Sequence, residues 1–285
     1  MDLLSFAFVQ RALIAAALVG LSSPTIGTYI VQRRLSLLGD GLGHVAIAGV
    51  GLALMTGSAP LPWAVGICLV GALLIETLRQ RGRATGDIGL AVLFYGGLAA
   101  GVLMASVAGQ GAGGLSSYLF GSLNTVSSGD LWIVGGLSVI IIVIAIGLSP
   151  QLFTVCADED FAKTLGLPAR LYNYLIVVLA AITVTCAMRT VGLLLVSALM
   201  VIPVAAAQNI FHGFKAGLWG AMLIGLIASL GGYVTSIYAN LSPGALIVLI
   251  TIAFFVVSWP ISALLHRHSR HIGSLGHIAS GPTNG

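Results

Sequence analysis

Long apolar runs separated by short charged clusters organise this chain of 285 residues. The first run, residues 12–32, lies between basic residues. A helix that crosses a bilayer needs about 20 mostly apolar residues, so this run predicts one membrane span. Residues 41–75 contain no Asp, Glu, Lys or Arg, and Gly-Ser-Ala-Pro-Leu-Pro at 57–62 is typical of a turn. The second run therefore predicts two spans.

The rest of the chain repeats this pattern. A span is predicted at residues 88–107, and a glycine- and serine-rich loop or partly re-entrant segment follows it. Further spans are predicted at 131–148, 171–188 and 191–210, and the run 216–266 is divided into two spans by Asn-Leu-Ser-Pro-Gly at 240–244. The expected fold is an all-α, polytopic transmembrane helical bundle of about nine spans, with eight and ten as the alternatives.

Composition excludes a soluble fold. Hydrophobic residues make up 58% of the chain and charged residues 7%, far below the roughly 25% charged residues of soluble domains. The net charge of +4 comes from short basic clusters between apolar runs, which indicate membrane topology rather than binding to nucleic acid. If these clusters are cytoplasmic, the C-terminus is cytoplasmic and the N-terminus is outside. We expect one membrane domain over residues 1–265.

Asp40 and His44 are the most informative polar pair inside an apolar segment. Residues four apart lie on the same face of a helix. Carboxylate and imidazole are ordinary zinc ligands, and manganese also accepts them. Ionisable residues within a span usually face a polar pathway. The alternative is that Asp40 caps the N-terminus of the second span and His44 is hydrogen-bonded within the bundle, and the residues alone leave both interpretations open.

The longest polar interruption lies at about residues 156–170. Its acidic residues come first, Ala162 and Lys163 follow, and Gly166 and Pro168 end it, which predicts a short helix. In a cytoplasmic loop, a short amphipathic helix is a docking element for a partner. An ordinary solvated loop is the alternative.

Several enzyme motifs are absent from the sequence. No Gly-x-x-x-x-Gly-Lys-Ser/Thr occurs, so the chain has no P-loop for nucleotide phosphates, and any dependence on ATP must come from a partner. Gly-x-Ser-x-Gly and His-Glu-x-x-His are also absent. We therefore expect no catalytic residues.

The end of the chain, residues 266–285, is predicted to be a disordered cytoplasmic tail rich in His and Arg. Four of the six histidines lie in it: His266, His268, His271 and His277. Histidine-rich tracts can bind metals. A positively charged stop at the membrane surface explains them equally well.

Five motifs, in order, carry a resemblance to a known family: residues 34–49 with Gly-Asp and His44, Gly-Asp-Ile-Gly at 86–89, Phe-Gly-Ser at 120–122, residues 158–166, and residues 191–203. In these motifs the chain resembles the permeases of the zinc and manganese ABC importers, the ABC-3 family. The resemblance extends over nearly the whole chain.

This resemblance implies the membrane-spanning permease subunit of an ATP-driven importer for zinc or manganese in the bacterial plasma (inner) membrane. It implies a second permease copy, two ABC ATPase subunits and an extracytoplasmic metal-binding protein as partners, within the lipid bilayer. Asp40 and His44 would bind the metal in transit, and no cofactor would be held permanently. The residues implied in coupling to the ATPase are Asp158, Glu159, Phe161, Ala162 and Gly166.

Two alternatives belong to other classes of transporter. A permease for an iron chelate or a corrinoid would need a wider and less ionic path, against which Asp40 and His44 argue. An ion-coupled secondary carrier would often show inverted repeats, and the sequence contains no convincing internal repeat. Zinc, manganese and ferrous iron all remain open as the transported metal.

Overall fold

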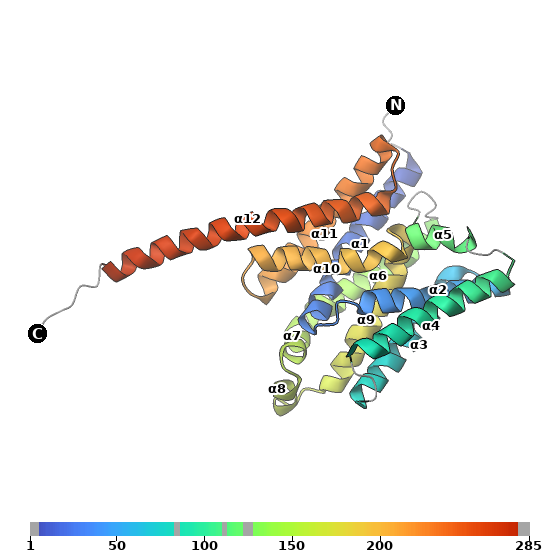
Figure 1. Ribbon diagram of the computed structural model, residues 1–285, viewed down its shortest axis with the longest axis horizontal. Helices are drawn as coiled ribbons and strands as arrows, with labels where there is room; N and C mark the ends of the chain where they lie inside the picture. Colours follow the sequence, from blue (N-terminus) through green and yellow to red (C-terminus); the bar gives the residue numbers. More distant parts are fainter. Residues whose placement is uncertain (1–5, 83–85, 110–112, 122–127, 279–285) are drawn as a thin grey trace, which may run out of the picture.

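The protein is α-helical throughout the part that the structure describes, as the sequence predicts. The computed structural model describes residues 6–82, 86–109, 113–121 and 128–278, and within these ranges it contains helices and no strand (Figure 1). The helices in the first half are α1 (Ala7–Gln32), α2 (Leu38–Thr56), α3 (Pro60–Gln80), α4 (Gly86–Val107), α5 (Gly113–Phe120) and α6 (Ser128–Gly147). In the second half they are α7 (Ser149–Ala157), α8 (Glu159–Thr164), α9 (Ala169–Thr190), α10 (Leu193–Ile210), α11 (Phe214–Ala239) and α12 (Pro243–Ile278).

Each predicted span falls on a helix, but the count of about nine membrane-crossing helices is not confirmed exactly. Among the described residues, seven helices are long and apolar enough to cross a membrane, or eight if α6 and α7 form one bent span. These two helices meet at 71°, and Pro150 lies in the first turn of the second one, where proline has no helical hydrogen bond to lose. The apolar part of α10, Leu195–Ile210, is shorter than a full span.

Glycine allows α4 to pack directly on the backbone of α2. A Cβ added at Gly97 would lie 2.7 Å from the carbonyl oxygen of His44, and one at Gly51 would lie 2.6 Å from the carbonyl oxygen of Gly101. Small residues permit such close approach between helices that lipid does not drive together. This packing buries much of α2, the helix on which Asp40 and His44, the two predicted metal ligands, lie.

Helices α1 and α11 run in opposite directions, which defines the two ends of the bundle. At one end, the rings of Tyr29 and Phe214 lie 5.5 Å apart, near the end of α1 and the start of α11. At the other end, Phe8 of α1 and Ser236 of α11 line the same pocket. Arg33 directly follows α1, so it lies at the first of these ends. Its ion pair with Glu76 brings the end of α3 to the same place.

Helix α12 continues beyond the bundle to Ile278, and Figure 1 shows it projecting away from the other helices. The sequence instead predicts a disordered tail from residue 266. The side chains from residue 264 onward, including the four tail histidines, lie outside the described residues, as do residues 279–285. The division into a membrane domain and a tail therefore stays a prediction.

Candidate functional site

The connection between α1 and α2 places Asp40 in the first turn of α2. Arg33 ends α1, and Arg34 adopts the left-handed region with φ 58°, which turns the chain sharply before Leu38. A carboxylate in the first turn interacts favourably with the positive end of the helix dipole. However, the N-cap position is Leu37, and no side chain caps this helix. Asp40 therefore does not cap α2, which was the alternative interpretation of this residue.

The carboxylate of Asp40 instead contacts α10. Ser197 Oγ donates a hydrogen bond to Asp40 Oδ1 at 2.5 Å. Gly39 allows this approach, because a Cβ added there would lie only 3.3 Å from Ser197 Cβ. Asp40 also lines a pocket of about 340 Å³ between α2 and α4, together with Leu37, Gly41, Leu90, Ala91, Phe94 and Tyr95. The carboxylate thus lies beside a largely apolar pocket and accepts a hydrogen bond from a hydroxyl in a distant part of the chain.

His44 lies one turn further along α2 and is almost completely buried, with 6% of its surface exposed. Its Nδ1 lies 2.8 Å from the backbone oxygen of Asp40. Since a carbonyl oxygen can only accept, this hydrogen bond favours the proton on Nδ1 and leaves the lone pair of Nε2 for a metal. The ring also packs against Phe94, with centroids 3.8 Å apart. Both contacts fix the orientation of the imidazole, as a metal ligand requires.

The described part of one chain supplies only this pair of metal-binding side chains at the site. No group of three or more His, Cys, Asp or Glu residues that could hold a metal ion occurs among the described residues. Within these limits, the structure brings Asp40 and His44 to one face of one helix, and it assigns Ser197 as a partner that sequence reasoning missed. No local signal in the sequence pairs Ser197 with a residue so distant in the chain.

The short helix predicted in the polar interruption is α8. Asp158 caps it, since its Oδ1 accepts hydrogen bonds from the backbone nitrogens of Asp160 at 3.0 Å and Phe161 at 2.9 Å. Such a cap satisfies nitrogens that the helix itself leaves unpaired. Gly166, with φ +77°, turns the chain after the helix. The predicted helix and both of its end signals are confirmed.

Helix α8 has one face toward the protein and one toward solvent. Ala162 is fully buried and packs in a small cluster with Val155 and Ala169. On the other face, the side chains of Phe161 and Leu165 are more than half exposed. The structure thus leaves two large apolar side chains uncovered on a short, capped helix.

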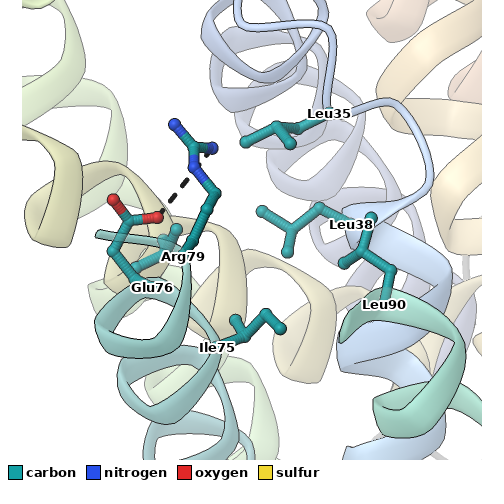
Figure 2. Close-up of a pocket in the computed structure, with 7 residues that line it drawn as sticks. Leu35, Leu38, Ile75, Glu76, Arg79 and Leu90 are labelled. Carbon is teal, nitrogen blue, oxygen red and sulfur yellow. Dashed lines mark ion pairs between the residues drawn. The ribbon is translucent and has the colours of Figure 1, made fainter. Parts of the chain in front are cut away.

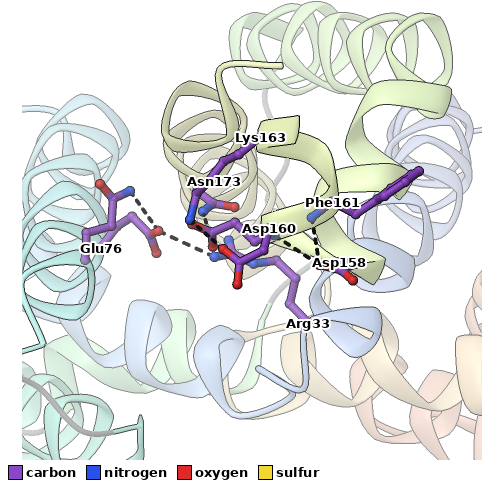
Figure 3. A network of polar contacts seen from close by, with 9 residues as sticks. Arg33, Glu76, Asp158, Asp160, Phe161, Lys163 and Asn173 are labelled. Atoms are coloured by element: carbon purple, nitrogen blue, oxygen red, sulfur yellow. Dashed lines mark hydrogen bonds and ion pairs between the residues drawn. The ribbon is translucent and has the colours of Figure 1, made fainter. Parts of the chain in front are cut away.

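Polar contacts anchor α8 to α9. Asn173 Nδ2 donates to Glu159 Oε2 at 3.0 Å, and Lys163 forms ion pairs with Glu159 at 3.1 Å and Asp160 at 3.0 Å (Figure 3). Partial burial raises the pKa of Glu159, but the hydrogen bonds from Lys163 and Asn173 outweigh it and lower the pKa overall. Glu159 therefore holds α8 in place as a carboxylate.

A buried ion-pair cluster lies beside these contacts, at the ends of α1 and α3. Glu76 is 1% exposed. It accepts from Arg33 Nη2 at 3.4 Å (Figure 3) and from Gln80 Nε2 at 3.1 Å. Arg79 lies 4.0 Å from the same carboxylate (Figure 2). Burial, followed by the charge of Arg79, lowers the pKa of Arg33. The signal that could have revealed this cluster is a carboxylate within an apolar run, which is expensive unless paired.

The described helices form a bundle whose long apolar members could cross a membrane, and the sequence contains no P-loop. The family model of the ABC 3 transport family matches residues 5–262, which is most of the chain. The chain belongs to this family. It is therefore a permease subunit of an ABC transporter, the membrane component, and is not itself an enzyme. The resemblance seen in the sequence is confirmed.

Individual relatives agree over nearly their full length. The chain is 32% identical over 273 residues to the manganese transport system membrane protein MntC of Halalkalibacterium halodurans, covering 94% of this chain and 93% of that protein. It is 29% identical to the manganese import system permease protein ScaB of Streptococcus parasanguinis, covering 94% and 96%. Among solved structures, PsaBC from Streptococcus pneumoniae in complex with Fab matches with a TM-score of 0.83 and 29% identity, covering 93% of this chain and 97% of that one.

Proposed function

We propose that this permease moves manganese across a bacterial plasma membrane through a path lined by Asp40 and His44. The observation that carries the proposal is the geometry of this pair: two ligand-type side chains one helical turn apart, with the His44 ring oriented by the Asp40 backbone at 2.8 Å. The names of the manganese permeases that match the chain support manganese as the metal. Carboxylate oxygen with a single imidazole also suits this ion better than a sulfur-rich set would.

The path is completed by a second copy of the chain. One copy offers a single carboxylate and a single imidazole at the site, and the described residues supply no third ligand side chain near them. Two copies would place two of each around one ion. Such a site holds a metal less rigidly than a closed structural site does, and transport requires both entry and release.

Energy for transport comes from two ATPase subunits that dock on α8. The exposed Phe161 and Leu165 supply the apolar contact, and Glu159 and Ala162 hold the helix on the bundle. An extracytoplasmic binding protein delivers manganese to the end of the helical bundle opposite α8. In this proposal manganese is the transported substrate, and transport needs no permanently bound cofactor.

The test is transport by the complete assembly in vesicles. The chain, its ATPase and its binding protein are reconstituted into liposomes, and accumulation of radioactive manganese and zinc is measured with and without ATP. We expect accumulation of manganese that depends on ATP and exceeds that of zinc. A complex that hydrolyses ATP and accumulates neither metal would refute the proposed function. Accumulation of zinc alone would refute the choice of manganese and keep the class of transporter.

A further inference from the structure

The buried end of α1 contains a cation that is only half paired. The Arg33 side chain is 4% exposed, and its Nη2 donates to Glu76 Oε1 at 3.4 Å, a long hydrogen bond. Its second terminal nitrogen, Nη1, has no hydrogen-bond partner among the described residues. A buried donor without an acceptor is costly, so its presence calls for an explanation.

A complementary acceptor lies in the same polar network, on the side of α8. Asn173 uses its Nδ2 to hold Glu159, but its Oδ1 is buried and without a partner in the described part of the chain. Figure 3 shows the contact between Arg33 and Glu76 beside the contacts of Asn173 and α8. The positive charge of Arg33 also acts on the Glu159 carboxylate, which lies one hydrogen bond from Asn173. A buried donor without a partner at the end of α1 and a buried acceptor without a partner on α9 thus lie on two helices that pack together.

The chain connects both groups to functional segments. Asn173 holds α8 through Glu159, and Arg33 begins the short connector that leads to α2 and Asp40. If Arg33 and Asn173 became paired, a movement of α8 would therefore be transmitted to the connector between α1 and α2. Packed interfaces usually have two discrete arrangements rather than a continuous range, so exchange of one hydrogen bond can separate two states.

We propose that Arg33 is a positioning residue that couples α8 to the metal site: when the ATPase moves α8, Arg33 Nη1 pairs with Asn173 Oδ1 and shifts the α1–α2 connector beneath Asp40. The inference rests on the proposed function, because it assumes that α8 receives motion from an ATPase. Glu76 accepts a hydrogen bond from Nη2 and so keeps the guanidinium in place, whether or not Nη1 is paired with Asn173. The role needs two terminal nitrogens on one planar group, which arginine has and lysine lacks.

The experiment compares Arg33→Lys with Arg79→Lys in the full transporter. Both variants keep the positive charge beside Glu76, but the Arg79 side chain is partly exposed and lies 4.0 Å from the Glu76 carboxylate. Manganese accumulated per ATP hydrolysed is measured in liposomes. We expect Arg33→Lys to lower this ratio several-fold and Arg79→Lys to keep the parental ratio. A parental ratio in Arg33→Lys would overturn the inference, because a purely structural clamp would change the amount of folded complex and leave the ratio alone.

Asn173→Ala provides a second variant that does not depend on the folding of Arg33→Lys. It should lower the ratio at least as far as Arg33→Lys does, because it also removes the hydrogen bond to Glu159. The double variant should lower the ratio no further than Asn173→Ala alone, because both changes remove the contact between Arg33 and Asn173. A double variant whose loss equals the product of the two single losses would contradict a shared contact. Absence of manganese transport by the parent assembly would instead refute the proposed function, so the two failures are distinguishable.

Discussion

Ser197 Oγ in α10 donates a hydrogen bond to Asp40 Oδ1 in α2 at 2.5 Å, which joins two helices far apart in the sequence at the proposed metal site. The hydroxyl contacts one of the two carboxylate oxygens, Oδ1. Partners of this kind orient a metal ligand without touching the metal. In other metal sites, their loss typically weakens metal binding about 10- to 100-fold.

Ser197→Ala should therefore raise the manganese concentration needed for half-maximal uptake by about tenfold, while the amount of protein in the membrane stays unchanged. Ser197→Thr keeps the hydroxyl and should behave nearly as the parent. Ser106→Ala serves as the matched control, because its hydroxyl bonds only to the backbone of its own helix, at Val102. Equal half-maximal concentrations in Ser197→Ala and the parent would show that the Ser197 contact does not position the ligand.

His44→Ala should abolish manganese uptake, because it removes the imidazole whose Nε2 is available to the metal. His212→Ala is the matched control: His212 is exposed and lies in the connection between α10 and α11. Uptake of radioactive manganese in cells lacking other importers measures both variants. Near-parental uptake by His44→Ala would remove the imidazole from the path.

The two faces of α8 should respond differently to substitution. Phe161→Ala removes an exposed side chain and should reduce co-purification of the ATPase, with little change in the thermal stability of the permease alone. Ala162→Leu forces a larger side chain into a fully buried position, and overpacking of this kind costs about 1–3 kcal/mol. It should therefore displace α8 and lower both stability and binding. Undiminished co-purification of the ATPase with Phe161→Ala would argue against α8 as the docking element.

The purified chain alone should hydrolyse no ATP, since its sequence contains no P-loop. Addition of the cognate ATPase should yield a stable complex with activity. Phosphate release by the isolated permease, above that of a detergent blank, would contradict this expectation. A preparation from cells lacking the ATPase excludes contamination as the source.

Local signals explain what the sequence predicted correctly. Apolar runs of span length became helices, the predicted turn at Gly57 ends α2 with φ 64°, and the acidic residues that were predicted to begin a short helix begin α8. Each of these depends on neighbours within a few residues. The 71° bend between α6 and α7 was not predicted, because the apolar pattern alone does not distinguish one long helix from two.

Contacts between distant segments could not be predicted from the sequence. Asp40 and His44 were identified by their spacing, but the Ser197 hydroxyl and the Phe94 ring reach them only through the packing of α10 and α4. The pairing of Arg33 with Glu76 depends in the same way on how α1 and α3 end together. From the sequence alone, Arg33 indicates membrane topology, and Glu76 marks a boundary between two predicted spans.

The central claim, that Asp40 binds the transported ion, is tested most directly by uptake in Asp40→Asn. Asparagine keeps the size of the side chain and can still accept the hydrogen bond from Ser197, so the link between α2 and α10 survives. It lacks the negative charge that attracts a divalent cation in a site of low dielectric constant. With radioactive manganese in cells lacking other importers, and with equal protein in the membrane, the account predicts loss of uptake. Uptake equal to that of the parent would contradict it.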